Sequence, residues 1–299
     1  MSKKFLFITF LSCLIAFSSY SQVTEQKTNK RLKVITTSYP DYTPFSYLEQ
    51  HGKSTDLISI FSEPLNNALS TNNIFTDYVS AKNYEENIED LRSGEYDILM
   101  GLYNETQNGY KKFDHIEYLY PAVIQNPVSI ITLNNTKNKI TNINDLRTLR
   151  GVYLSNEYFS DYILDRFKYY GIKPVDDGIN AYKKLFLGQV DYIIGSYYYH
   201  YVFSLQNGIN NYLLFSKKPI WNMPMFIGIS KKSKNYNRLK ILLSKKITDP
   251  VFSQSIKEEM KKHVKNFEQK SIGVVPPSFV LEQNENILTP ADEILVKED

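Results

Sequence analysis

The chain has 299 residues, of which 42% are hydrophobic and 22% are charged, so it can bury a substantial core without disulfides. Its formal net charge is +3, and a balance so near neutrality argues against nucleic acid as a partner. Cys13 is the only cysteine, which excludes an intrachain disulfide and a site built from several thiolates.

The N-terminus predicts export. Two lysines precede an apolar run over residues 5–17, and Ser19 and Ser21 supply the small residues that a signal peptidase reads. We expect residues 1–21 to be removed, which leaves 33 of the 35 basic side chains against 32 acidic ones, and the mature protein to lie in the periplasm. The alternatives are an uncleaved anchor, for which the run is shorter than the ~20 residues that span a bilayer, and a lipoprotein attached through Cys13.

Predicted strands and helices follow in turn along the mature chain, after a polar and flexible leader over residues 22–31. Strands are expected over residues 32–37, 128–133, 152–154 and 225–230, and helices over about 56–69, 158–170, 236–247 and 251–267. Pro64 lies inside the first of these helices and implies a kink or a later start near Ser62. A further helical pattern begins at Tyr84. Residues 268–299 form a tail that we expect to lie along the surface or to be partly disordered.

One short pattern occurs twice in the chain. Residues 94–101 and 188–195 each have Gly, then Asp three residues later, then Gly after a hydrophobic run. A helical pattern precedes each copy, and an apolar run bounded by glycines is typical of a strand buried on both faces. Helix, tight Gly turn and buried strand form one α/β step, so two copies indicate two related α/β lobes.

Five motifs stand in an order that is known from one protein family. They are Y-x-P-F at Tyr42–Phe45, L-x-x-G-x-x-D at Leu91–Asp97, the segment Ile143–Arg147, G-x-V-D at Gly188–Asp191 and the strand Phe226–Lys231. In these residues the chain resembles the family 3 extracellular solute-binding proteins, the periplasmic receptors best known for uptake of polar amino acids. The resemblance covers about residues 32–267.

The resemblance implies an α/β fold in which two α/β lobes are joined by two crossover strands, with a ligand cleft between them (periplasmic binding protein type II). Lobe 1 would comprise residues 32–124 plus 225–267, and lobe 2 residues 125–224, with crossovers near 125–127 and 218–223. The lobes would close on a small-molecule ligand like a hinge, in the manner of a Venus flytrap, and an ABC permease or a membrane sensor would recognise the closed form. We expect a monomer without a cofactor.

The loops that follow the strands carry the candidate ligand contacts, because open α/β sheets bind ligands beyond the carboxyl ends of their strands. By resemblance, Tyr42 and Tyr84 occupy aromatic positions that pack against ligand. Asn104 occupies the position of a small hydroxyl residue that bonds ligand. The plainer explanations are rings that fill the core under the loops and, for Asn104, a solvated surface turn.

Three further candidates lie in the second half of the chain. Ser155 and Asn156 stand at an expected helix start, where free backbone N–H groups and the helix dipole favour an anion, although simple capping explains them equally well. Ser196 follows the second repeat. The four histidines are isolated in the sequence, so we expect no metal site.

Two departures from the family weaken the expectation of an amino-acid ligand. Receptors for α-amino acids carry an Arg that clamps the α-carboxylate in a bidentate fork, and no Arg stands at the corresponding position near Gly109. A shifted alignment brings only Lys111 or Lys112 into range, and lysine supplies a point charge and not a fork. The same receptors carry an Asp where this chain has Ser196. Losing both partners of a zwitterion indicates another ligand class, or a protein that no longer binds small molecules tightly.

The sequence therefore favours a periplasmic solute-binding protein that captures a small polar solute, amino-acid-like or related, for ABC-type uptake. The first alternative is an orphan sensor or interaction protein on the same fold, which the long tail and the lost zwitterion partners favour. The second is a dehydratase-like enzyme. We expect no enzyme, because motifs such as G-x-S-x-G and H-E-x-x-H are missing from the sequence.

Overall fold

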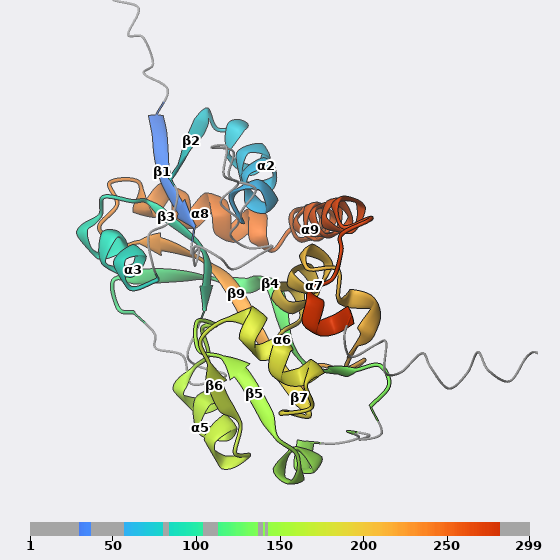
Figure 1. Ribbon diagram of the computed structural model, residues 1–299. Coiled ribbons are helices and arrows are strands. Elements are labelled where there is room, and N and C mark those ends of the chain that lie inside the picture. Colours follow the sequence, from blue (N-terminus) through green and yellow to red (C-terminus); the bar gives the residue numbers. More distant parts are fainter. Residues whose placement is uncertain are drawn as a thin grey trace, which may run out of the picture.

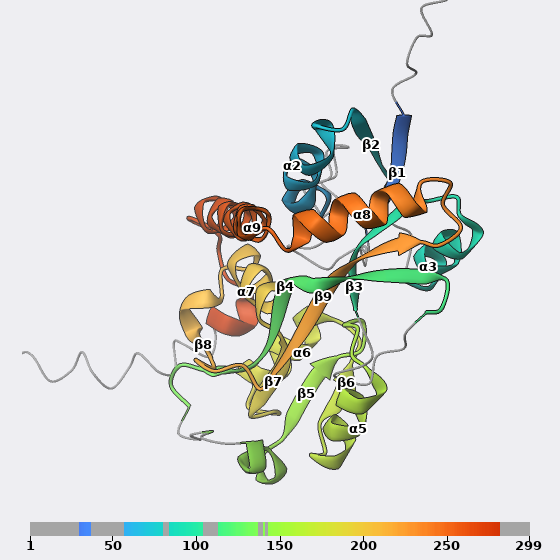
Figure 2. The ribbon, with the colours of Figure 1, turned by 180° about the vertical axis from the view of Figure 1, so that it is seen from behind.

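The computed structural model describes residues 30–36, 57–79, 84–103, 113–136, 140 and 143–281, and within these ranges the chain forms two α/β lobes that share one mixed sheet (Figures 1 and 2). The strands are β1 (Lys30–Thr36), β2 (Ile74–Val79), β3 (Ile98–Tyr103), β4 (Ile116–Leu133), β5 (Gly151–Leu154), β6 (Lys173–Val175), β7 (Tyr192–Ser196), β8 (Leu213–Phe215) and β9 (Trp221–Ser230). The α-helices are α2 (Leu57–Ser70), α3 (Tyr84–Ser93), α5 (Asp161–Tyr169), α6 (Gly178–Phe186), α7 (Tyr197–Gln206), α8 (Tyr236–Ile247) and α9 (Pro250–Lys270), and two short 3-10 helices are η1 (Ile143–Thr148) and η2 (Asn210–Tyr212).

The two lobes repeat the same arrangement of strands. The order across the sheet is β2-β1-β3-β9-β4-β7-β5-β6, with β8 paired to β4. On one side β1 lies parallel to β2 and β3, and β9 joins β3 antiparallel. On the other side β5 lies parallel to β6 and β7, and β4 joins β7 antiparallel. Each lobe thus has three parallel strands and one antiparallel neighbour, as expected for two related α/β units.

The long strands β4 and β9 connect the lobes. They pair antiparallel from Ile116↔Ser230 to Val128↔Trp221, and Figure 2 shows both running from the upper lobe into the lower one. The pairing shifts between Leu119 and Ile124. Extra residues in one strand of a ladder bend that strand and increase its twist. The hydrogen-bonded sheet thus bends at this point between the two lobes and remains continuous.

The duplicated sequence pattern plays the same structural role in both lobes. Gly94 and Gly188 have positive φ angles of 80° and 63°, which glycine adopts at little cost, and each turns the chain from a helix toward a buried strand. The Asp that follows fixes that strand to its parallel neighbour. Asp97 exchanges backbone and side-chain hydrogen bonds with the backbone of Lys33, at 2.9 and 3.0 Å. Asp191 does the same with Arg150, at 2.7 and 2.8 Å.

The second of these aspartates gives a pH-dependent prediction. The side chain of Arg150 also donates to Asp191, at 3.0 and 3.1 Å, and holds the pKa of that carboxyl below its ordinary 3.8. A depressed pKa in the folded state gives stability that is present above pH 3.8 and is lost as the pH falls through the folded value.

Asp191→Asn should therefore lower the free energy of unfolding by about 1–2 kcal/mol at neutral pH, a modest figure because Arg150 is largely exposed. Urea unfolding from pH 7 to pH 2 should show the difference from the parent protein shrinking below pH 3.8. The exposed Asp165→Asn serves as control, and a gap that stays constant down to pH 2 would contradict the role of the ion pair.

Most predicted elements are confirmed, but several of their boundaries differ, among them the start of β9 at Trp221 and not at residue 225. The helix with Pro64 begins at Leu57 and continues through the proline to Ser70, so the later start near Ser62 is not observed. The helix expected over 158–170 begins only at Asp161, because Ser160 caps it and accepts a hydrogen bond from the backbone N–H of Ile163. The strand expected over 128–133 is the end of the much longer β4.

The chain beyond α9 packs against the second lobe as far as it is described. Helix α9 extends to Lys270, past the predicted end at residue 267, and a turn and a short helical segment at 278–281 follow. Val280 is fully buried, and the Phe279 ring lies 5.9 Å from that of Phe186 in α6. The predicted signal peptide, the leader up to residue 29 and the tail from residue 282 lie outside the described residues. No helix that the structure describes is long and apolar enough to cross a bilayer. The residue boundaries of the lobes stay a prediction.

Candidate functional site

The carboxyl ends of parallel strands from both lobes define the candidate site. β5 pairs with β7 in the register Val152↔Ile193, which places Ser155, directly after β5, level with Ser196, the last residue of β7. In the other lobe β3 ends at Tyr103. This edge of the sheet is where open α/β folds bind their ligands.

Glu157 turns inward from the loop after β5 and is fully buried. Its Oε2 accepts a hydrogen bond from the backbone N–H of Ser196 at 2.7 Å, and its Oε1 lies 2.7 Å from Nε2 of His200. The side chains of Glu157 and His200 expose no surface to solvent. Gly195 makes this approach possible, since a Cβ there would lie within 2.5 Å of Glu157 Oε1. A buried carboxylate needs such partners, because desolvation of an unpaired charge is costly.

Tyr182 contacts the other ring nitrogen of His200. Its hydroxyl lies 3.0 Å from Nδ1 of the histidine. Burial raises the pKa of Tyr182 well above its ordinary value, with smaller contributions from Tyr199 and Glu157, so the phenol keeps its proton. Two acceptors are within reach of that proton, Nδ1 of His200 and, at 3.4 Å, the backbone carbonyl of the same residue. Tyr182, His200 and Glu157 form one contiguous buried polar chain, in which the close Glu157–His200 contact does not have the geometry of a hydrogen bond.

Ser196 connects this chain to the first lobe. Its Oγ accepts from the backbone N–H of Tyr199 at 3.4 Å, which caps α7, and donates to Oδ1 of Asn126 at 2.7 Å. Asn126, on the shared strand β4, reaches the hydroxyl of Tyr103 at 3.5 Å. The Tyr103 ring stacks on Tyr158, with centroids 5.5 Å apart and planes 18° apart. Because Tyr103 ends β3 and Tyr158 follows β5, this stack joins the two lobes.

Of the six predicted contacts, the structure describes the side chains of Ser155, Asn156 and Ser196. Ser155 and Asn156 are exposed, and Ser155 Oγ bonds the carbonyl of Val175 at 3.3 Å. The prediction that these two residues open a helix is wrong, because α5 begins at Asp161. Ser196 is fully buried and bonded within the protein.

The other three predicted contacts lie partly or wholly outside the description. Tyr84 is the first residue of α3, but its side chain is outside the described residues. Tyr42 and Asn104 are outside them altogether, Asn104 directly after the last residue of β3. Contact with a ligand stays a prediction for all six residues.

The links among these loop residues could not be read from the sequence. Glu157, Asn126 and His200 come from three separate segments, and no local sequence pattern indicates that they belong to one network. One signal was present: His200 stands four residues after Ser196, one helical turn along, and therefore projects from the same face of α7. Gly195, directly before Ser196, has no side chain and so leaves space for the His200 ring.

The polar side chains of Glu157 and His200 are buried where a reactant does not reach them. Within the described ranges, no three side chains of the metal-binding types are grouped closely enough to hold an ion. Glu157 and His200 are an acid–base pair, yet neither is exposed, and a general base must reach the proton that it abstracts. The pair therefore orders the site and does not act on a substrate in this conformation.

Comparisons with known proteins identify the fold. No protein-family profile and no curated protein matches the chain. Among solved structures, the GluR0 ligand-binding core in complex with L-glutamate is 15% identical with a TM-score of 0.59, covering 79% of this chain and 99% of that one. A mutant of ArgBP from T. maritima is 15% identical with a TM-score of 0.55, covering 80% and 97%. The periplasmic VFT2 domain of Bordetella pertussis BvgS is 16% identical with a TM-score of 0.55, covering 80% and 94%.

The chain therefore has the type II periplasmic-binding-protein fold, with two α/β lobes joined by two strands. The strand order, the two shared strands β4 and β9 and these similarities agree on it. Fold alone does not fix function, and at 15–16% identity the likeness extends to the fold only.

Proposed function

We propose that the protein binds a small polar solute, amino-acid-like or related, between its two lobes in the periplasm, without catalysing a reaction. The observation that carries this proposal is the meeting of both lobes at the carboxyl ends of their strands, where Tyr103 of one lobe stacks on Tyr158 of the other. A solute held at such a junction contacts two bodies at once, so its binding free energy is coupled to their closure.

We propose uptake through an ABC permease as the role, with a sensor as the second candidate. The similar structures support either one: one is a binding protein named ArgBP, and another is a histidine kinase sensor domain with similarity to periplasmic binding proteins. A specific observation favours the sensor. Polar groups at the junction, Glu157 and Ser196 among them, bond to each other and not outward, so the chain's own side chains hold the lobes together. For either role we propose that lobe 1 comprises residues 32–124 plus 225–267 and that lobe 2 comprises residues 125–224.

A ligand screen by thermal shift tests the proposal. Amino acids, polyamines, sugars and organic acids would be added to the purified mature protein, and a ligand at a hundred times its Kd should raise the stability by ~2.7 kcal/mol. Tyr42→Ala and Tyr84→Ala should abolish the shift while leaving the free protein folded. Tyr169→Ala, at an exposed position of α5, is the matched control and should keep the shift.

Two outcomes would count against the proposal. Unchanged affinity in both tyrosine variants would show that these rings only pack within the protein. Turnover of any screened compound would show that the protein is an enzyme and not only a binding protein. Between the two roles, capture of a permease from membranes by the liganded protein would favour uptake, and capture of a signalling protein would favour the sensor.

A further inference from the structure

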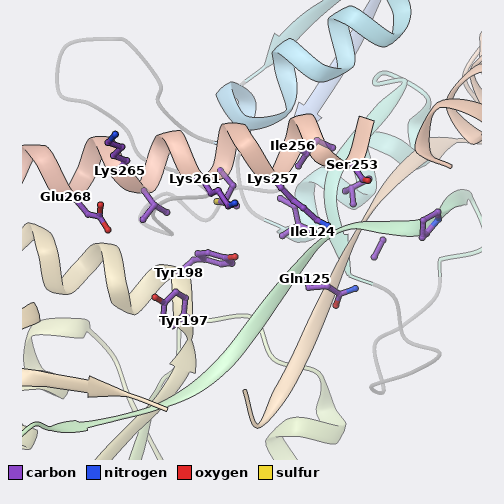
Figure 3. Close-up of a pocket in the computed structure, with 15 residues that line it drawn as sticks. Ile124, Gln125, Tyr197, Tyr198, Ser253, Ile256, Lys257, Lys261, Lys265 and Glu268 are labelled. Atoms are coloured by element: carbon purple, nitrogen blue, oxygen red, sulfur yellow. The ribbon is translucent and has the colours of Figure 1, made fainter. Parts of the chain in front are cut away.

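An apolar groove lies away from the Glu157 network, between α9 and the start of α7 (Figure 3). Its volume is about 800 Å³. The shifted stretch of β4 forms its base, Tyr197 and Tyr198 form one wall, and α9 forms the other. The apolar residues that line it include Val123, Ile124, Ile256, Met260 and Val264.

Three lysines line the α9 side of this groove. Lys257, Lys261 and Lys265 follow one another at intervals of four residues, and side chains so spaced lie on the same face of a helix. Figure 3 shows Lys257 and Lys261 extending from α9 into the space beside β4. All three are exposed, and no ion pair joins them to an acidic side chain within the described ranges.

The one acidic residue at the groove is already engaged. Glu268 accepts a hydrogen bond from the hydroxyl of Tyr201 at 2.8 Å, which ties the end of α9 to α7. The groove therefore combines an apolar floor with a positive edge. Its occupant should be apolar and anionic at once, because lysines attract carboxylates and the floor gains from burying apolar surface.

The last segment of the chain has this composition. Residues 282–299 include the apolar run Ile294-Leu295-Val296, with acidic residues on both sides of it. The acidic residues of the segment are Glu282, Glu285, Asp292, Glu293, Glu298 and Asp299, against the single basic Lys297.

The segment also starts close enough to reach the groove. Before it, the chain passes beside the end of α7, where the carbonyl of Val274 lies against Gly208. It is then anchored through the buried Val280. The passage at Gly208 is about one length of α7 from the groove at the start of that helix, ~15 Å for its ten residues. Eighteen extended residues span up to about 60 Å.

We propose that residues 286–299 dock in this groove, with Ile294-Leu295-Val296 on its apolar floor and the flanking carboxylates against Lys257, Lys261 and Lys265. The docked segment would contact α9, α7 and β4 together, and so would add to the connection between the lobes.

Carbodiimide cross-linking of the full mature chain tests the proposal, because it joins a lysine to a carboxylate only where the two are in contact. We expect intramolecular cross-links from Lys257, Lys261 or Lys265 to Asp292, Glu293 or Glu298, identified by peptide mass spectrometry of the monomer band. Their yield should fall as salt is raised, since exposed ion pairs are screened.

Variants separate the two parts of the contact. Asp substitution at Ile294 and Leu295 keeps every carboxylate but should lower the yield of those cross-links by about tenfold, because the apolar part of the contact is lost. The matched control replaces Lys168, Lys173 and Lys183, exposed on the second lobe, by Glu and should leave the yield unchanged.

Three results would overturn the proposal. They are cross-links from the segment chiefly to lysines outside the groove, cross-links only between two molecules, and an undiminished yield in the Ile294→Asp, Leu295→Asp variant.

Discussion

Replacing Glu157 by alanine is expected to lower the free energy of unfolding by about 2–5 kcal/mol, one of the two largest effects that we predict. The backbone N–H of Ser196 donates to this carboxylate, and Nε2 of His200 lies 2.7 Å from its other oxygen, in a region with no exposed surface. Alanine would leave the Ser196 N–H without an acceptor and the His200 ring without its close polar partner, at about 1–3 kcal/mol each. Urea unfolding at pH 7, followed by far-UV circular dichroism, measures the loss.

Two further variants make this result specific. Glu157→Gln keeps the volume and one acceptor oxygen, and should cost less than the alanine variant. Glu95→Ala, an exposed carboxylate in the first repeat, should change the stability by no more than about 0.5 kcal/mol. An alanine variant at position 157 as stable as the one at position 95 would contradict the network.

The fold was predictable where its signals are local. The pattern Gly-x-x-Asp located β3 and β7, because a glycine turn and a strand-fixing aspartate depend on residues only a few positions apart. Helix α8 was predicted to the residue. The full length of β4 was not, since Pro121 and Pro127 interrupt the apolar pattern and the strand is completed by β9, about a hundred residues later in the chain.

The candidate site was predictable only in part, for a related reason. The repeat led directly to Ser196, because that residue follows the second copy. The partners of Ser196 are 39 and 70 positions away, at Glu157 and Asn126, and no short pattern encodes such distances. The prediction that a helix starts at Tyr158 also shortened the loop that carries Glu157. The helix in fact starts after Ser160, whose side chain caps it.

The internal network bears on how the lobes move. A ligand shifts a conformational equilibrium only by the difference in its affinity for the two states. Here the Tyr103–Tyr158 stack and the Ser196–Asn126 hydrogen bond already stabilise contact across the junction. A ligand that enters must add to these contacts or replace them, and a weak ligand would leave the lobes as they are. This dependence on the existing contacts is the reason that the sensor is kept as the second candidate for the proposed role.

Gly195→Ala is the second substitution with a large expected effect, about 1–3 kcal/mol of stability lost. The added Cβ would lie within 2.5 Å of Glu157 Oε1 and closer still to Nε2 of His200, and overpacking of a buried site forces neighbours out of place. Gly171→Ala is the control: its Cβ would meet open space, so only the left-handed backbone at φ 72° opposes it, at about 1–2 kcal/mol.

A double-mutant cycle then separates crowding from other causes of instability. His200→Ala alone should be destabilising, because Glu157 loses its partner. If the methyl group added by Gly195→Ala clashes with the imidazole, the double variant should be more stable than the sum of the two losses predicts, by about 1 kcal/mol or more. Thermal unfolding of the four proteins supplies the cycle, and strict additivity would show that Gly195 is required for a reason other than the close approach of His200.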